Sequence, residues 1–179
     1  MMLELAVLCA VFAQPEFYLS ESRQRSTCEI LPEVLENAER NDIDPFLLMG
    51  LITVESNWNP KAESWAGACG LTQVMPQYTG GAATKGIKYT CESLKRPKTG
   101  VKAGSDILSW WVKSYGKGHI PTGLCGYYSG FRCKPQINKA GERYYKKVLK
   151  QESKIKRAYQ KALARFGDPL RYPERTGND

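Results

Sequence analysis

Histidine is nearly absent from this sequence: His119 is the single histidine among 179 residues. It lies in a loop-like Gly-Lys-Gly-His-Ile-Pro stretch, and nothing there marks a partner for a Ser/His or Cys/His nucleophile system. The six cysteines include no Cys-x-x-Cys pair, so the closely spaced ligands of a zinc site are missing as well. We therefore expect neither a metal nor a cofactor.

An apolar run of membrane-spanning length is not found at the N-terminus, because the stretch from Leu3 to Ala13 is too short to cross a bilayer. It resembles the apolar part of a secretory signal, with Val11-Phe12-Ala13 as a candidate cleavage site. No Lys or Arg precedes it, and Glu4 interrupts it, which argues against that interpretation. Both alternatives stay open, and residues 1–27 are treated as a leader and lead-in.

Internal repeats and strand-like alternation are also missing, whereas helical periodicity recurs along the chain. The length suits one domain, and we predict a mainly α fold. Polar residues 20–27 suggest a loose lead-in, residues 71–75 form a short apolar piece, and residues 79–98 read as a long surface loop. The predicted helices cover 29–40, 45–56, 99–115, 122–128 and 139–166, and the residues after 166 are expected to be disordered.

The cysteines themselves favour disulfides formed in an oxidising compartment. Cys125 and Cys133 flank a tight Gly-rich turn and are the first predicted pair, and Cys69 with Cys91 is the second. Removal of a leader that contains Cys9 would leave one of the other five cysteines unpaired.

Positive charge is concentrated at the C-terminal end. Residues 139–166 contain ten Lys or Arg and two acids, which accounts for the whole formal net charge of +8. Such a segment favours anionic partners, such as cell-wall polymers, lipid headgroups or nucleic acid, although a solvated helix face explains it equally well. No nucleic-acid-binding motif accompanies the charge. We assign the basic helix to an anionic envelope surface and consider nucleic acid unlikely.

Residues 44–56 carry the most informative pattern. Asp44 is typical of a helix N-cap and Pro45 of the first helical residue, and an apolar stripe follows. Glu55 falls on that stripe near the helix C-terminus, where burial and the helix dipole both disfavour a negative charge. These effects raise the pKa of a carboxyl group and suit it to act as a general acid. A Glu that reaches solvent at a fraying helix end is the alternative for an isolated motif.

Four separated pieces then occur in one order: Glu55-Ser56; Asn59-Pro60-Lys61-Ala62 with Ser64 and Gly67-Ala-Cys-Gly-Leu-Thr-Gln-Val-Met-Pro76; Cys125-Gly-Tyr-Tyr-Ser-Gly130; and Gly141-Glu-Arg-Tyr-Tyr-Lys-Lys-Val148. In this order the sequence resembles the soluble lytic transglycosylase (SLT) family, whose fold is the goose-type lysozyme fold. The resemblance covers roughly residues 28–150, and residues 151–179 would add a basic helix extension and a disordered tail. One departure is Tyr128, which stands where the family has Asn.

The resemblance implies a role for each matched position. Glu55 corresponds to the single catalytic acid/base. Ser64 and Gln73 correspond to polar residues that contact the saccharide, and Met75 to an apolar wall of the glycan groove. Tyr127 corresponds to a tyrosine that hydrogen-bonds near the catalytic carboxylate. Tyr144 corresponds to a late groove tyrosine, with a register that is open by one because Tyr145 is adjacent. Alone, Gln73 and Ser64 are better explained as helix-cap or turn residues. Trp58 and Trp65 could stack on sugars, although single Trp residues more often pack inside.

One carboxylate is enough for the chemistry that the resemblance implies. Glycosidases usually need two carboxyl groups, but no matched motif supplies a second, and Asp44 lies about 16 Å along the helix from Glu55. A lyase avoids this need: it cleaves the MurNAc-(β1,4)-GlcNAc bond of peptidoglycan and forms 1,6-anhydro-MurNAc.

The expected protein is thus a monomeric, exported enzyme of the periplasm, cell envelope or exterior that acts on glycan strands. It could belong to a virion or a secretion channel, or it could take part in remodelling of the cell wall. The alternatives are a goose-type lysozyme that hydrolyses the same bond and a non-catalytic glycan-binding protein.

Overall fold

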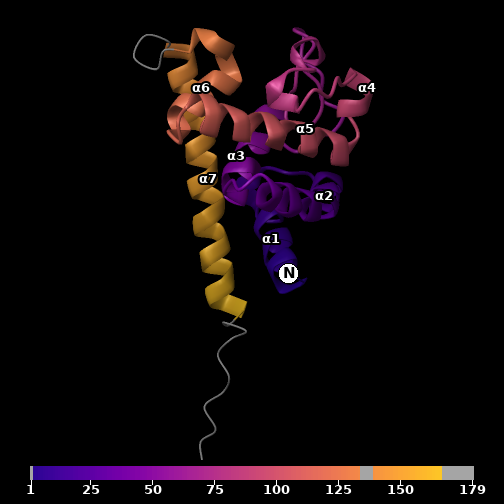
Figure 1. Ribbon diagram of the computed structural model, residues 1–179. Coiled ribbons are helices and arrows are strands. Elements are labelled where there is room, and N and C mark those ends of the chain that lie inside the picture. Colours follow the sequence, from indigo (N-terminus) through magenta and orange to yellow (C-terminus); the bar gives the residue numbers. More distant parts are fainter. Residues whose placement is uncertain (1, 134–138, 167–179) are drawn as a thin grey trace, which may run out of the picture.

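The computed structural model describes residues 2–133 and 139–166 (Figure 1). Within these ranges the chain is built from helices, and the only β pairing is two isolated bridges, Glu63 with Cys69 and Cys69 with Val74. The predicted mainly α class is confirmed. The residues after 166, which the sequence predicts to be disordered, lie outside the described residues.

Helix α3 (Pro45–Ser56) is the central element, and it begins and ends where the sequence predicts. The Asp44 carboxylate accepts a hydrogen bond from the Phe46 amide, and Pro45 occupies the first helical position. Six consecutive residues from Leu47 to Ile52 are buried. At Gly50 a Cβ atom would lie 2.9 Å from the Val148 carbonyl oxygen, so α3 packs with its backbone close to another helix.

That neighbour is α7 (Lys139–Phe166), which also contacts α6 (Ile120–Ser129) and α1 (Met2–Phe12) (Figure 1). The helix is continuous through residue 150. Its second half buries Ile155, Ala158 and Ala162 in the same core as α3, so the predicted basic extension is packed against the body of the molecule.

The N-terminal region is more ordered than the sequence suggests. Helix α2 spans Glu21–Arg40, so the polar stretch expected to be a loose lead-in is helical; Ser20 caps it by accepting from the Arg23 amide, and Thr27 is buried. Local polarity misled the prediction because residues 20–26 are all polar and show no apolar periodicity, although 21–26 form the first turns of a longer helix. The apolar segment considered as a leader is helix α1, which packs on α2 and α7.

Trp58 belongs to this core. It is fully buried, its indole N–H donates to the Thr53 hydroxyl over 3.0 Å, and Phe12 meets its ring edge-on at 4.7 Å between centroids. A role for Trp58 in stacking on sugars is therefore excluded, since its ring has no exposed face. Trp65 is the reverse case, because its side chain is entirely exposed.

The remaining elements form a second layer above α3 (Figure 1). Helix α5 (Pro97–Trp110) continues into a π-helical turn, Trp111–Tyr115, and then leads to α6. The long loop expected over residues 79–98 contains a 3₁₀ turn (Ala82–Thr84) and the short helix α4 (Cys91–Leu94).

Three disulfides tie the elements together. Cys125–Cys133 and Cys69–Cys91 are the two predicted pairs. Cys9–Cys28 is the third and joins α1 to α2, so Cys28 is the cysteine that removal of a leader containing Cys9 would leave unpaired. Among the described helices, none has both the length and the apolar character needed to cross a membrane.

Candidate functional site

The site begins with Glu55, in the last turn of α3. Its carboxyl group is half-buried, and burial raises its pKa from 4.5 to about 7, although a hydrogen bond from Tyr144 acts in the opposite direction. The chain leaves the helix immediately afterwards, because Asn57 adopts the left-handed conformation with φ of 47°. Near neutral pH, Glu55 is therefore present in both its protonated and its ionised form, as a general acid/base requires.

A tyrosine on α7 holds this carboxyl group. The Tyr144 hydroxyl donates to Glu55 Oε1, and the Tyr144 ring is buried and stacked on Tyr128, with 4.8 Å between centroids. The adjacent Tyr145 instead packs, partly buried, against the core, so of the two it is Tyr144 whose hydroxyl meets Glu55. Tyr128, the departure from the family pattern, therefore contacts the site through Tyr144.

Tyr127 approaches from α6. Its hydroxyl donates to the Thr72 carbonyl oxygen at 2.7 Å rather than to Glu55. Burial, and next the charge of Glu55, raise the pKa of the Tyr127 phenol, so the two groups lie in each other's field and Tyr127 remains a neutral donor. The structure thus places the two matched tyrosines on different partners: Tyr144 on the carboxyl group and Tyr127 on the backbone beside it.

The segment after α3 is bound to the end of that helix. The Ser56 hydroxyl donates to the Leu71 carbonyl at 2.8 Å, and the Thr72 hydroxyl donates to the Gly100 carbonyl at 2.9 Å. Gln73 has a φ of 49°, and its amide donates to the carbonyls of Gly70 and Ala62 at 3.0 and 3.3 Å. Two contacts of Gln73 thus fix its amide group and leave its carbonyl oxygen as an acceptor for a ligand.

Ser64 has a local role in the structure. Its hydroxyl accepts from the Ala68 amide at 3.0 Å, and its backbone N–H donates to the Ala68 carbonyl at 2.9 Å. These bonds close the turn that carries Trp65 outward. Ser64 is not among the residues that line the groove described next, whereas Gln73, Met75 and Tyr127 all are.

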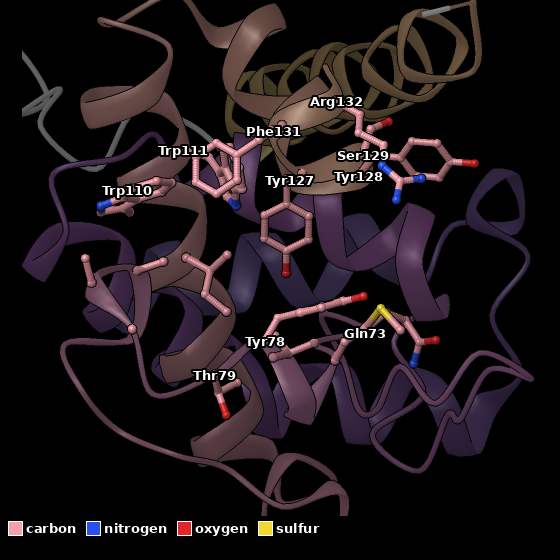
Figure 2. Close-up of a pocket in the computed structure, with 18 of the residues that line it drawn as sticks. Gln73, Tyr78, Thr79, Trp110, Trp111, Tyr127, Tyr128, Ser129, Phe131 and Arg132 are labelled. Atoms are coloured by element: carbon pink, nitrogen blue, oxygen red, sulfur yellow. The ribbon is translucent and has the colours of Figure 1, made fainter.

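A groove of about 1070 Å³ runs beside these residues (Figure 2). Gln73, Met75, Tyr78 and Thr79 form one wall, and residues of α6 including Tyr127 and Tyr128 form the other. Tyr127 points into it, as Figure 2 shows. Glu55 and Tyr144 are not among the residues that line the groove. They are linked to it because Tyr144 stacks on the groove-lining Tyr128, and Tyr127 lies in the field of Glu55.

The other end of the groove is aromatic, and the sequence argument did not identify it. Trp110, Trp111 and Phe131 gather there (Figure 2), with Phe131 5.1 Å from Trp111 and 6.0 Å from Trp110 between centroids. Phe131 is 73% exposed, so its ring is free to contact a ligand. The apolar faces of sugar rings suit such a surface. The adjacent Trp-Trp pair was the signal that could have indicated it.

Acidic groups are missing from the groove lining within the described part of the chain. Asp44 caps α3 and pairs with Lys156 at 2.5 Å, and Glu63 pairs with Lys95 at 2.5 Å. Glu63 also lies near the sulfur atoms of Cys69 and Cys91, but these are joined in a disulfide and cannot act as thiolate ligands. The site therefore offers one carboxyl group, two tyrosines and an amide.

Comparison with known proteins identifies the family to which the chain is similar. Residues 33–150 match the model of the Transglycosylase SLT domain. The membrane-bound lytic murein transglycosylase C of Actinobacillus pleuropneumoniae serotype 5b is 46% identical over 52 residues, which are 29% of this chain and 14% of that protein. Its counterpart in Haemophilus influenzae PittGG is 35% identical over 86 residues, 46% of this chain and 24% of that protein. The matches thus span at most a quarter of these relatives' lengths.

Solved structures show the same fold. An inactive Glu-to-Gln mutant of the lytic transglycosylase Slt from Pseudomonas aeruginosa superposes with a TM-score of 0.62 at 17% identity, over 72% of this chain and 24% of that one. The 70 kDa soluble lytic transglycosylase of Escherichia coli gives 0.61 at 21% identity, over 70% and 24%. Because the family model covers most of the chain, from α2 to the first turns of α7, this protein belongs to the Transglycosylase SLT domain family.

Proposed function

We propose that this protein is a peptidoglycan lytic transglycosylase in which Glu55 is the single general acid/base. The observation that carries the proposal is the half-buried Glu55 carboxyl group, bound by Tyr144, whose ring stacks on Tyr128 of a groove whose described lining contains no acidic side chain. Two comparisons support the same assignment. The relatives are named as lytic murein transglycosylases, and one structural neighbour is a Glu-to-Gln mutant that is inactive.

The chemistry needs only this group. Protonated Glu55 gives its proton to the oxygen between N-acetylmuramic acid and N-acetylglucosamine as the bond from that oxygen to C1 breaks. The substrate's N-acetyl group can stabilise the cation that develops at C1. The ionised Glu55 then takes the proton from the muramic acid C6 hydroxyl, whose oxygen closes on C1 to give the 1,6-anhydro ring. A pKa of about 7 suits Glu55 to both steps.

Hydrolysis of the same bond is the runner-up. An inverting hydrolase would need a second carboxylate about 6.5–9.5 Å from the acid to activate water, and a retaining one would need a nucleophile about 5–5.5 Å away. Asp42 and Asp44 stand at the start of α3 and are bound to Lys113 and Lys156, so neither is available. Intramolecular attack by the C6 hydroxyl needs no second carboxylate. Glu55 itself takes the proton, and the hydroxyl oxygen belongs to the same sugar as C1 and so is already close to it.

The other matched residues would position the glycan. Gln73 offers its side-chain carbonyl oxygen, Met75 an apolar wall, and Tyr127 fixes the backbone at Thr72. Ser64 would act through the turn that it closes, which presents Trp65. Tyr144 would hold Glu55 in place.

The partners and the location follow from this activity as proposals. We expect a monomer that acts on glycan strands after export to the periplasm, envelope or exterior, with association with a virion or a secretion channel as settings of the same chemistry. The basic helix α7 would face an anionic surface of the envelope.

Digestion of purified peptidoglycan with the wild type and with Glu55→Gln tests the proposal. The substitution keeps the shape of the side chain and removes its acid function. We expect anhydro-muropeptides from the wild type and a rate at least a hundredfold lower from the variant. A variant that keeps its activity would contradict the role of Glu55, and binding without products from the wild type would favour the non-catalytic alternative.

A further inference from the structure

The cations of α7 are arranged on one side of the helix. At about 100° per residue, eight of them fall within an arc of about 80° and extend over about 39 Å of helix. We call this set the basic stripe: Lys139, Arg143, Lys147, Lys150, Lys154, Arg157, Lys161 and Arg165. All of them are exposed except Lys154, which is half-buried. In Figure 1, α7 lies along one edge of the molecule, with α1, α2 and α3 together on one side of it.

The stripe is largely uncompensated. The two acids of α7 lie away from it: Glu142 pairs with Lys146 at 2.5 Å, and Glu152 pairs with Lys156 at 2.7 Å on the side that faces Asp44. Within the described part of the chain, no stripe residue has an acidic side chain within ion-pair distance. Glu142 does lie in the field of Lys139 and Arg143, at the edge of the stripe. Ion pairs within the described part of the chain therefore do not account for these cations.

An exposed aromatic side chain lies beside the stripe. Lys154 donates to the Glu16 carbonyl and lies 4.5 Å from the Phe17 ring and 5.9 Å from the Tyr18 ring, and Tyr18 is 87% exposed.

We propose that the basic stripe and the exposed side chain of Tyr18 form a docking surface for the anionic headgroups of a lipid bilayer. This inference goes beyond the proposed function and does not depend on the catalytic step. A straight row of cations on a rigid helix can meet many headgroups of a flat surface at once. A tyrosine side chain suits the boundary between headgroups and acyl chains, whereas a polyanion in water leaves the exposed Tyr18 ring in contact with solvent.

Docking would place the groove close to the bilayer. The stripe begins at Lys139, next to Ala140, which lines the groove, and Tyr144 on the same turns of α7 holds Glu55. The core contacts of α7 face the opposite way, so binding requires no rearrangement of the fold.

Vesicle sedimentation tests the proposal with the full chain. We would compare vesicles of phosphatidylcholine alone with vesicles of equal parts phosphatidylcholine and phosphatidylglycerol. The stripe variant replaces Lys147, Lys150, Arg157 and Lys161 by Gln. The control variant replaces four exposed cations elsewhere by Gln and so has the same net charge: Arg25, Lys88, Arg96 and Lys117.

We expect the wild type and the control variant to bind the anionic vesicles in a salt-sensitive manner and not to bind the neutral vesicles. Each cation near an anionic surface contributes about fivefold to affinity, so the stripe variant should lose several hundredfold. Its circular dichroism, melting temperature and release of products from soluble glycan chains should stay unchanged, which separates this outcome from a failure of the proposed enzyme activity.

Equal losses in the two variants would overturn the proposal, because the effect would then be net charge alone. So would vesicle binding that the stripe variant retains. Stripe-dependent binding to lipid-free peptidoglycan or to duplex DNA, without binding to vesicles, would also overturn it and would assign the stripe to that polymer.

Discussion

At the scale of single residues, the site depends on how one carboxyl group is kept protonated. Burial at the end of α3 raises the pKa of Glu55 to about 7, and the hydroxyl of Tyr144 limits that rise because it donates to the charged form. Each effect can be tested with a variant of its own.

The first prediction concerns stability and pH. Because the pKa of Glu55 is higher in the folded state, its contribution is fully present below about pH 4.5 and is lost as the pH rises through about 7, which amounts to about 3 kcal/mol. Glu55→Gln cannot lose a proton. It should match the wild type near pH 4.5 and be more stable by up to about 3 kcal/mol near pH 8. Urea unfolding at both pH values measures this, and parallel curves for the two proteins would refute it.

The second prediction separates the two tyrosines. Tyr144→Phe removes the hydrogen-bond donor to Glu55 and so raises the pKa of Glu55. The basic limb of the pH profile of kcat/KM should therefore move to higher pH, and kcat should fall about tenfold. Tyr127→Phe is the matched control, because its hydroxyl is bound to the Thr72 carbonyl. It should leave that limb in place and lower the free energy of unfolding by about 1–3 kcal/mol. If the basic limb of the pH profile moved equally in both variants, the separate roles given to Tyr144 and Tyr127 would be contradicted.

At the scale of elements, the close approach of α3 and α7 positions Glu55 against Tyr144. Gly50 permits this approach, since a Cβ there would lie 2.9 Å from both the Val148 carbonyl oxygen and the Glu152 nitrogen. These are backbone atoms of a long helix, which cannot move aside independently.

We therefore predict that Gly50→Ala lowers the free energy of unfolding by about 1–3 kcal/mol, although alanine is the better helix former. Activity should fall as well, because α7 carries Tyr144. Gly81→Ala is the control, as its Cβ would meet nothing within 4 Å. Chemical denaturation of both variants measures the difference. A Gly50→Ala protein as stable as the wild type would show that α7 can shift.

The sequence predicted some elements better than others for physical reasons. Helix α3 has a cap, an N-terminal proline and a continuous apolar run, so its bounds were predictable. The start of α2 was not, because the residues that follow Ser20 are polar without an apolar periodicity, as in a loop. The site motif indicated Glu55, but the choice of Tyr144 over Tyr145 depends on how α7 is rotated against α3, which local pattern cannot specify.

Tryptophan positions illustrate the same limit. Local sequence does not distinguish Trp58, which is fully buried against Phe12, from Trp65, which is fully exposed on its turn. The aromatic end of the groove joins α5, the π-helical turn and the turn after α6, three segments whose proximity is a property of the fold.

At the scale of the whole molecule, the groove extends from Tyr127 and Tyr128, which lie next to the proposed acid/base Glu55 and its partner Tyr144, to this aromatic surface. The fold places Gln73 and Met75 from one half of the chain opposite Tyr127 from the other. A glycan strand in the groove would therefore be held along its length while its bond is cleaved near Glu55.

Phe131→Ala should raise KM for soluble glycan chains about fivefold to tenfold and leave kcat nearly unchanged, because a stacking contact distant from Glu55 binds ground state and transition state alike. Tyr18→Asn is a suitable control: it removes an equally accessible ring outside the groove, at a position whose φ of 54° asparagine tolerates. Steady-state kinetics on chains of defined length measure the effect. A fall in kcat with KM unchanged would place Phe131 in the chemical step instead.

The central claim is that Glu55 acts alone and that the substrate's own C6 hydroxyl, rather than water, captures C1. Digestion of peptidoglycan in water enriched in heavy oxygen, followed by mass spectrometry of the released muropeptides, tests this most directly. The account predicts products lighter than hydrolysis products by one water and free of the heavy isotope. Reducing-end products that carry one heavy oxygen would contradict it and would identify the protein as a hydrolase.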